Sequence, residues 1–307
     1  MSDNNRIELT VLGRCAALPC RKGNQSGQIL SLHNKLMLID CGEGTQSLLR
    51  NNGFSLARIN HIFISHLHGD HMLGLPGLLS TLGMLGKKGA ISIYAPAELK
   101  TYLDQQIAFF GGDFGFPIDF HSFDPFHSEL IYEDKTLTVK TIPLKHTMPC
   151  CGFLFEEKSK PKHINRERCD FYGVPISQYN NIKAGLDFVN EKGITIPNEQ
   201  LTTPAEAAKK YAYCSDTAYT EKIIPYIYNA DCIYHEATFL SKDAKRAKET
   251  QHSTASQAAT IALKARVKKL IIGHISARYS NFEELRKEAD AIYKGAILAE
   301  EGKTYII

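Results

Sequence analysis

Short apolar runs and segments of helical periodicity alternate along the chain. The apolar runs predict β-strands, and their continuous apolar character predicts strands that are buried on both faces. The predicted strands cover residues 6–12, 35–40, 59–65, 90–95, 136–142, 211–215, 231–235, 268–273 and 303–307.

Apolar positions spaced three and four apart between these runs predict helices. The predicted helices cover residues 44–52, 76–86, 96–109, 219–228, 254–266 and 281–294. Pro76 is expected at the first position of its helix, and Thr254 with Gln257 predicts a capping box at the start of another. Buried strands with helices between them predict an α/β protein whose sheets are covered by helices, rather than a β-sandwich.

The segment 156–193 interrupts this alternation. It is polar, rich in Lys and Arg, and dotted with Gly, Pro and Tyr. We interpret it as an arm inserted into a single domain that spans 1–307. An ordinary surface excursion is the alternative interpretation.

Composition and charge exclude little. The chain of 307 residues has a formal net charge of +3, which neither requires nor excludes a polyanionic partner. No stretch approaches the roughly 20 consecutive apolar residues of a membrane span, and the polar start MSDNNRIELTVLG is not typical of a signal or transit peptide. The eight cysteines form no CxxC pair, so we expect reduced thiols in a cytoplasmic protein. Metal ligation by Cys41 or Cys214 is the alternative use of a thiol.

The segment ISHLHGDH, at 64–71, directly follows the apolar run of a predicted strand. His66 and His68 can point to one side of an extended backbone. A glycine then permits a sharp turn, after which Asp70 and His71 reach a second position. Imidazole and carboxylate groups suit zinc, and they also suit manganese or iron. The alternative is a loop of solvated histidines, some of which cap the next helix.

Further ligands are expected at the ends of other strands. His146, Asp216 and His274 each follow an apolar run. Each one alone fits a cap or a turn residue equally well, but together with the loop they complete two sites of three to four ligands, which Asp216 could bridge. Asp40 ends another run, and its carboxylate can accept the free N–H of a ligating imidazole. A plain Asx turn is the alternative for Asp40.

These residues and their order resemble the signature of the metallo-β-lactamase superfamily. The residues that carry the resemblance are Asp40, His66, His68, Asp70, His71, His146, Asp216 and His274. The resemblance implies a four-layered αβ/βα sandwich of two mixed sheets. More local stretches resemble the ribonuclease Z family, in particular its Bacteroidetes type. They read LIDCGEGTQ (38–46), SHLHGDHMLGLPGLL (65–79), YHEATF (234–239), QHSTASQAA (251–259) and GHISARY (273–279).

The family resemblance implies a zinc-dependent endoribonuclease that removes the 3′ trailer of precursor tRNA and leaves a 3′-hydroxyl on the tRNA. It implies two Zn²⁺ per chain, with Asp216 as the bridging ligand and Asp70 as the general base. One ion takes His66, His68 and His146, and the other takes Asp70, His71 and His274. The resemblance places the catalytic acid at His252, for which a helix-capping histidine is the alternative. It also implies a homodimer in which the arm of one subunit serves the site of the other.

The chain departs from the family pattern in two places. The loop at 19–24 carries shifted basic residues, and the stretch 173–185 of the arm lacks the Gly-Pro pair of the family. Candidate tRNA contacts in the arm are Lys158, Lys160, Lys162, Arg166, Arg168 and Lys183. A solvated basic surface is the alternative for this patch.

Two other functions fit the same motifs. One is a metallo-β-lactamase-fold hydrolase that acts on a small phosphodiester or thioester. The other is a tRNA-binding relative that has lost catalysis, which the intact ligand set disfavours.

Overall fold

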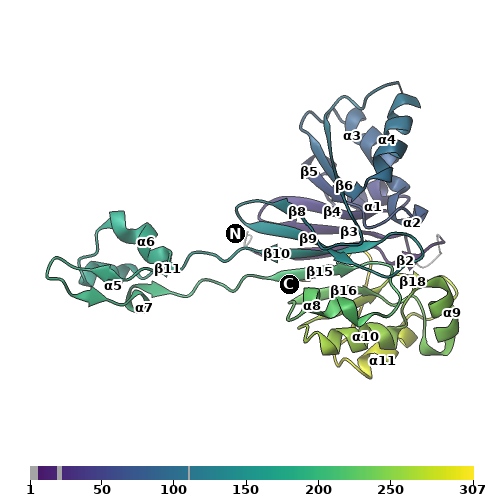
Figure 1. Cartoon of the computed structure of the whole chain (residues 1–307). Coiled ribbons are helices and arrows are strands. Elements are labelled where there is room, and N and C mark those ends of the chain that lie inside the picture. Colours follow the sequence, from purple (N-terminus) through teal and green to yellow (C-terminus); the bar gives the residue numbers. More distant parts are fainter. Residues whose placement is uncertain (1–5, 19–22, 110) are drawn as a thin grey trace. The chain divides into compact units, whose positions relative to one another are not determined.

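The structure, a computed structural model, describes residues 6–18, 23–109 and 111–307 (Figure 1). The chain divides into two compact units. One, which we call the body, comprises the residues up to Glu156 together with Lys209–Ile307. The other, which we call the insert, comprises Glu157–Ala208.

Two mixed sheets form the centre of the body, each with seven strands among the described residues. The first sheet has the order β20 (Thr304–Ile306), β1 (Glu8–Gly13), β3 (Gly27–Leu32), β4 (Lys35–Cys41), β5 (Ile59–Phe63), β6 (Ile91–Pro96) and β7 (Ile118–Phe123). The second has the order β19 (Ile297–Leu298), β17 (Leu270–Gly273), β16 (Cys232–Glu236), β15 (Lys210–Cys214), β10 (Cys151–Glu157), β9 (Leu137–Pro143) and β8 (Leu130–Glu133). A short parallel pair joins β2 (Cys15–Ala16) to β18 (Ile275–Ser276).

Helices cover the outer face of each sheet. On the first sheet they are α1 (Thr45–Asn51), α2 (Gly69–Met72), α3 (Gly74–Met84) and α4 (Glu98–Phe109), with the 3-10 turn η1 (Leu56–Arg58). On the second they are η3 (Glu221–Ile223), α8 (Ile224–Ile227), η4 (Ser241–Asp243), α9 (Ala244–Thr250), α10 (Ala255–Lys264) and α11 (Glu283–Asp290). Among the described residues, none of these helices has the length and apolar character needed to cross a bilayer.

Alternating side chains along the strands build the layers. In β4, Leu36 and Leu38 pack toward the helices α1, α3 and α4, whereas Met37 and Ile39 pack between the two sheets. In β16, Ile233 faces the helices of the second sheet, and its neighbours face the first sheet. Because successive strand residues point to opposite faces, a continuous apolar run fills both layers at once. The predicted four-layered αβ/βα sandwich is confirmed.

The predicted elements are all present, with ends displaced by a few residues. One detail was wrong: α3 begins at Gly74, so Pro76 lies at the third helical position rather than the first. The chain runs almost without a break from α2 into α3, which moves the helix start toward the N-terminus. The predicted capping box is formed, because Thr254 Oγ1 accepts from Gln257 N and Gln257 Oε1 accepts from Thr254 N.

The insert has a small core of its own, formed by Cys169, Val174, Ile182, Ile196 and Leu201. Its elements are β11 (His163–Ile164), α5 (Arg166–Phe171), η2 (Ile176–Gln178), α6 (Tyr179–Lys183), β12 (Phe188–Val189), β13 (Thr195–Ile196), α7 (Asn198–Leu201) and β14 (Thr202–Thr203). The unit is longer than the expected arm at 156–193. The extra residues belong to it because β13 pairs with β12, β14 pairs with β11, and Leu201 lies in the core.

Seven cysteines lie in the described residues, and all seven are buried and free of disulfides. Cys20 lies outside the described residues, as does most of the departing loop at 19–24. Burial raises the pKa of the Cys41 and Cys214 thiols to about 12. Such thiols stay protonated at neutral pH and pack as small apolar groups, and neither belongs to the groups of potential metal ligands found in the described residues.

Phe63 tests the layer between the sheets. It is fully buried and packs against Tyr94, Phe153 and Phe155 with ring centroids 4.7–5.6 Å apart. We expect Phe63→Ala to lower the free energy of unfolding by about 3–5 kcal/mol, because it removes a large apolar side chain and leaves a cavity. Met84→Ala, at a helix end where the side chain is 79% exposed, is the control and should change it by less than about 0.5 kcal/mol. Equal effects in urea unfolding would contradict the assignment of this layer.

Candidate metal centre

Seven side chains meet where several strands end. The loop after β5 supplies His66, His68, Asp70 and His71, and the segments after β9, β15 and β17 supply His146, Asp216 and His274. β15, β16 and β17 pair in parallel, so their carboxyl ends lie at the same edge of the second sheet. This is the edge at which α/β sheets bind ligands. The structure therefore brings all seven predicted ligands together.

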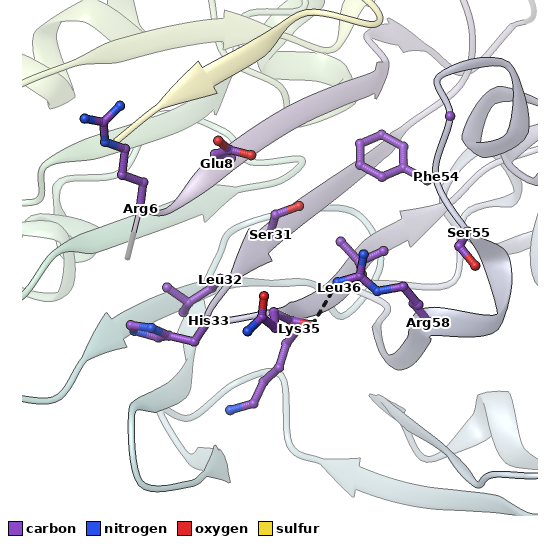
Figure 2. Close-up of a pocket in the computed structure, with 12 residues that line it drawn as sticks. Arg6, Glu8, Ser31, Leu32, His33, Lys35, Leu36, Phe54, Ser55 and Arg58 are labelled. Atoms are coloured by element: carbon purple, nitrogen blue, oxygen red, sulfur yellow. Dashed lines mark hydrogen bonds between the residues drawn. The ribbon is translucent and has the colours of Figure 1, made fainter. Parts of the chain in front are cut away.

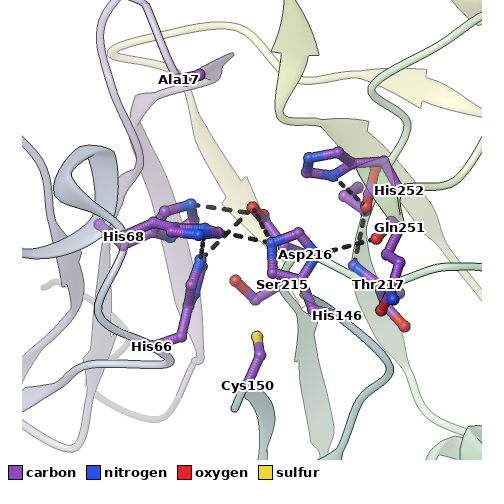
Figure 3. Close-up of polar contacts among 12 residues, drawn as sticks. Ala17, His66, His68, His146, Cys150, Ser215, Asp216, Thr217, Gln251 and His252 are labelled. Carbon is purple, nitrogen blue, oxygen red and sulfur yellow. Dashed lines mark hydrogen bonds and ion pairs between the residues drawn. The ribbon is translucent and has the colours of Figure 1, made fainter. Parts of the chain in front are cut away.

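Four donor atoms form the first set. His68 Nδ1 lies 3.0 Å from His66 Nε2 and 3.2 Å from His146 Nε2. Asp216 Oδ2 lies 3.6 Å from His66 Nε2 and 3.7 Å from His146 Nε2. Donors about 2.0–2.1 Å from a tetrahedral ion lie about 3.3–3.4 Å from one another, so the four atoms are spaced as ligands of one ion (Figure 3).

The second set has the same spacing. His71 Nε2 and His274 Nε2 are 3.2 Å apart, and Asp70 Oδ2 lies 3.5 Å from the former and 3.3 Å from the latter. Asp216 Oδ1 lies beside these three donors, 3.4 Å from His71 Nε2 and 3.2 Å from His274 Nε2. Asp216 thus offers one oxygen to each set.

Asp216 Oδ1 is a buried atom without a hydrogen-bond partner in the described part of the chain. An anionic oxygen left in this state is costly unless a cation satisfies it. Burial by itself would raise the pKa of Asp216, but the nearby His274 and His71 hold it well below its ordinary value. The residues therefore fit a pair of divalent ions, and a donor set of imidazole and carboxylate groups suits zinc.

Hydrogen bonds to the second nitrogen orient the imidazoles. His71 Nδ1 donates to Asp40 Oδ2 at 2.7 Å, and His146 Nδ1 donates to the carbonyl oxygen of Gln251 at 2.9 Å. His274 Nδ1 lies 3.1 Å from Thr238 Oγ1, which can accept from it. Each bond leaves the Nε2 lone pair free to face the space between the seven donor side chains, which together we call the cage.

Asp40 is the hub of these supporting contacts. Besides His71, its carboxylate accepts from the backbone N of Ser65 at 2.8 Å, from Ser65 Oγ at 2.9 Å and from Tyr213 OH at 2.6 Å. The expected contact with a ligating imidazole is present. Asp40 also has φ 55°, a left-handed conformation that is uncommon for a residue with a side chain.

Two glycines allow the ligand loop to sit close to β4. A Cβ atom on Gly74 would lie 2.0 Å from the carbonyl oxygen of Gly42, and one on Gly42 would lie 2.5 Å from the carbonyl oxygen of Asp70. The start of α3 therefore presses directly on the turn after β4. Only glycine at both positions permits this approach, which fixes the loop at 66–72.

His252 and Glu236 form a pair beside the second donor set. His252 Nδ1 donates to Glu236 Oε1 at 2.8 Å, and the His252 ring stacks on that of His274 with centroids 5.5 Å apart. Burial by itself would lower the pKa of His252, but the charge and hydrogen bond of Glu236 raise it to about 9. His252 also lies close enough to Asp216 and His274 to serve as a ligand. In its protonated form the His252 ring can donate a proton.

The sequence places Glu236 at the end of a buried strand, where it could orient neighbouring groups, but it did not indicate His252 as the partner. Glu236 is fully buried and accepts from His252, from the backbone N of Thr217 at 2.8 Å, and from the backbone N and Oγ1 of Thr238 at 3.1 and 2.6 Å. Its position at the carboxyl end of β16 was the one available signal. His235 is buried in the sheet, and its Nδ1 donates to the carbonyl oxygen of Glu236 at 2.7 Å.

A separate cavity of about 410 Å³ lies at the amino ends of β4 and β5 (Figure 2). Arg6, Lys35 and Arg58 line it, and Arg58 donates to the carbonyl oxygen of Asn34 at 3.1 Å. Among the described residues, none of the groups of potential metal ligands includes a residue of this cavity. It is not part of the metal centre.

Comparison with known proteins identifies the family. The model of the family described as Anti-Pycsar protein Apyc1 matches residues 7–160, so this half of the chain belongs to that family. Over 296 residues, the chain is 53% identical to the Ribonuclease Z of Parabacteroides distasonis, and the match covers 96% of this chain and 97% of that protein. The chain belongs to the ribonuclease Z family. The resemblance predicted from the motifs is thereby confirmed.

Solved structures agree with this assignment. The short form of human tRNase Z is similar with a TM-score of 0.71 and 25% identity, over 97% of this chain and 98% of that chain. The metallo-beta-lactamase fold protein YhfI of Bacillus subtilis is similar with a TM-score of 0.70 and 18% identity, over 99% and 100%. The ribonuclease Z homologue thus has the metallo-β-lactamase fold, and it is a metal-dependent endoribonuclease.

The shared carboxylate makes a prediction about metal content. Asp216→Ala removes one donor from each set, so we expect it to weaken binding of both ions, whereas His146→Ala should weaken binding of one. Metal per chain, measured by plasma emission after dialysis, should fall by more in Asp216→Ala. His127→Ala, at an exposed histidine outside the cage, should keep the full content. Unchanged metal content in both cage variants would contradict the assignment.

Proposed function

We propose that this ribonuclease Z homologue is a zinc-dependent endoribonuclease that removes the 3′ trailer of precursor tRNA. The observation that carries the proposal is the pair of donor sets joined by Asp216, with the His252–Glu236 pair beside them. Hydrolysis of the phosphodiester would leave a 3′-hydroxyl on the tRNA. We assign it two Zn²⁺ per chain and place it in the cytoplasm, where precursor tRNA and reduced thiols both occur.

The residues of the cage divide the work. When bound, a pair of divalent ions neutralises charge on the phosphodiester and lowers the pKa of a water to about 7. His66, His68 and His146 would hold one ion, Asp70, His71 and His274 the other, and Asp216 would bridge. Asp70 is held in place by the backbone N of Ala17, which donates to its Oδ2 at 2.8 Å. We assign Asp70 to orient the attacking water and accept its proton.

His252 would supply the proton that the leaving group needs. The departing oxygen is the 3′ oxygen of a ribose, which is a poor leaving group unless it is protonated. Glu236 holds Nδ1 of the His252 ring, which leaves Nε2 as the atom that donates to this oxygen. Thr217 and Thr238 in turn hold the Glu236 carboxylate.

The insert is the proposed tRNA-binding surface. Lys160, Lys162 and Lys183 line a cavity of about 510 Å³ within it, together with Asn180. Lys162 Nζ donates to Asn198 at 2.8 Å, and Lys160 lies 3.4 Å from Glu206, so Lys183 is the least engaged of the three. Recognition of folded RNA through backbone charge and shape fits such a surface. We further propose a homodimer in which the insert of one subunit serves the cage of the other.

Cleavage of a 3′-extended tRNA transcript tests the function. The protein should cut once near the 3′ end and leave a 3′-hydroxyl, and Asp70→Ala should lower kcat by at least about 10²-fold because it removes the proposed base. Mapping the cut by primer extension and end-labelling gives the position. Efficient turnover of bis-p-nitrophenyl phosphate without any cleavage of the transcript would favour a hydrolase of small phosphodiesters instead.

The role of His252 predicts a difference between substrates. His252→Ala should lower kcat on precursor tRNA by about 10²–10⁴-fold, because the ribose oxygen then departs without a proton. The effect on bis-p-nitrophenyl phosphate should be much smaller, since p-nitrophenolate leaves readily as an anion. His235→Ala is a poor control because the ring is buried, so His127→Ala serves instead. An equal loss on both substrates would contradict the acid role.

The insert predicts a change in salt dependence. Lys183→Ala should weaken binding of precursor tRNA and lower the slope of log affinity against log salt by about one unit, because one phosphate contact is lost. Lys294→Ala, at a lysine that is 91% exposed in the body, is the matched control. If filter-binding titrations show the same affinity and slope for both variants and the wild type, the insert does not bind tRNA through this lysine.

A further inference from the structure

Two cavities adjoin the cage. One, of about 570 Å³, includes His146 and Cys150 in its lining, and we call it the His146 cavity. The other, of about 550 Å³, includes His252 and Ala17, and we call it the His252 cavity. Figure 3 shows Ala17 and Cys150 on opposite sides of Asp216. The rings of His146 and His252, which line the two cavities, have centroids 4.9 Å apart, so one strand can occupy both cavities in turn.

The reaction gives the two cavities different occupants. This step rests on the proposed function, in which the bond between phosphorus and the 3′ oxygen of the tRNA breaks. The electron pair of that bond goes to the 3′ oxygen, which takes the proton of His252 Nε2, while the attacking water becomes part of the 5′-phosphate of the trailer. The last nucleotide of the tRNA must then lie on the His252 side. The trailer must lie on the side of the His146 cavity.

The His146 cavity has the chemistry of a site for single-stranded nucleic acid. Lys145 and Lys222 line it, and neither side chain has an ion-pair partner within the described ranges. The aromatic rings of Phe126, Tyr219 and Tyr226 also line it, and Phe126 and Tyr226 are 64% and 39% exposed. No carboxylate is among the lining residues of this cavity that the structure describes. Lysines with exposed aromatic rings bind successive phosphates and stack bases without a fixed sequence.

Backbone contacts hold the two walls of this cavity together. The backbone N of Ala218 donates to the carbonyl oxygen of Lys145 at 2.7 Å, and the backbone N of Lys145 donates to Thr217 Oγ1 at 3.1 Å. These bonds join the segment that carries His146 to the segment that follows Asp216. The His146 cavity is thus built on two of the segments that supply metal ligands. Its position relative to the cage is therefore fixed.

The His252 cavity is built differently. Its two arginines are already engaged, since Arg246 lies 3.5 Å from Glu249 and Arg278 lies 3.8 Å from Asp243 and stacks over Phe239 at 4.8 Å. This cavity therefore presents guanidinium groups held in place by ion pairs, whereas the lysines of the His146 cavity have no ion-pair partner among the residues that the structure describes. It suits one defined nucleotide at the end of a folded RNA.

We propose that the His146 cavity binds the 3′ trailer of the substrate, with Lys145 and Lys222 on its phosphates and Phe126, Tyr219 and Tyr226 against its bases. The site takes single-stranded RNA of variable sequence. It makes the protein favour precursors whose trailer extends several nucleotides past the cut.

Trailer length tests the proposal through kinetics. Precursors with one-nucleotide and six-nucleotide trailers are compared by kcat/KM. The wild type should favour the six-nucleotide trailer several-fold, mainly through KM, and Lys222→Ala and Tyr226→Ala should bring the ratio close to one. The salt slope for the long trailer should fall by about 0.7 in Lys222→Ala, as for one phosphate of a single strand. Lys294→Ala is the control. If the variants instead have a general structural fault, kcat/KM will fall equally for both precursors and the ratio will stay unchanged. That result would overturn the proposal.

Photocrosslinking supplies a second measurement that does not depend on turnover. A precursor with a 2′-deoxy methylphosphonate at the cut resists hydrolysis and carries 4-thiouridine either at the second trailer position or at the last tRNA position. The trailer probe should crosslink to peptides containing 143–150 or 219–226, and the tRNA probe to peptides containing 239–252 or 276–278. The reverse pattern would overturn the assignment of the cavities. A wild type that leaves every precursor uncut would instead refute the proposed function, and the crosslinks would still report where each end binds.

Discussion

One carboxylate shared between two sets of imidazoles is the interaction on which the centre depends. Asp216 turns one oxygen to each set, and the side chain is almost completely buried. A buried carboxylate needs partners for both of its oxygens, and cations at the two donor sets would supply them. Every other arrangement at this edge follows from that need. Strand ends bring the donors close, and hydrogen bonds fix their lone pairs.

The backbone that supports the ligands is strained, and the surrounding hydrogen bonds offset this strain. Asp40 and His274 both adopt positive φ angles, and a conformation of this kind costs about 1–3 kcal/mol at each residue. Four hydrogen bonds to the Asp40 carboxylate offset the cost at that position. In return the His71 ring has one orientation. A relaxed backbone at Asp40 would turn its carboxylate away from His71 and leave the imidazole free to rotate.

The sequence predicted many of the strands and the clustering of the potential ligands because both follow one local rule. Each ligand segment comes directly after an apolar run, so finding the run also finds the ligand. Strands β3, β7, β8, β10 and β19 of the two sheets were not predicted. In β3, apolar residues are mixed with Gln28 and Ser31, although Gln28 is buried and accepts from Tyr211. The Glu236–His252 pair escaped because it joins a strand end to a helix start, and no periodicity links them. The end of the insert beyond residue 193 was not predicted, because strands of two residues are too short to show an alternation of apolar and polar positions.

Selectivity must come from surfaces outside the cage. A pair of divalent ions stabilises the attack on almost any phosphodiester, and nothing in the donor sets distinguishes tRNA from a small ester. Binding energy from parts of the substrate far from the reacting phosphorus can raise the rate only for molecules large enough to reach those parts. The insert has a core of its own and contributes no donor to the cage. In the proposed function its lysines therefore change which RNA is held, and the His252–Glu236 pair changes how fast the held RNA is cut. Because separate residues carry the two properties, each can vary without loss of the other.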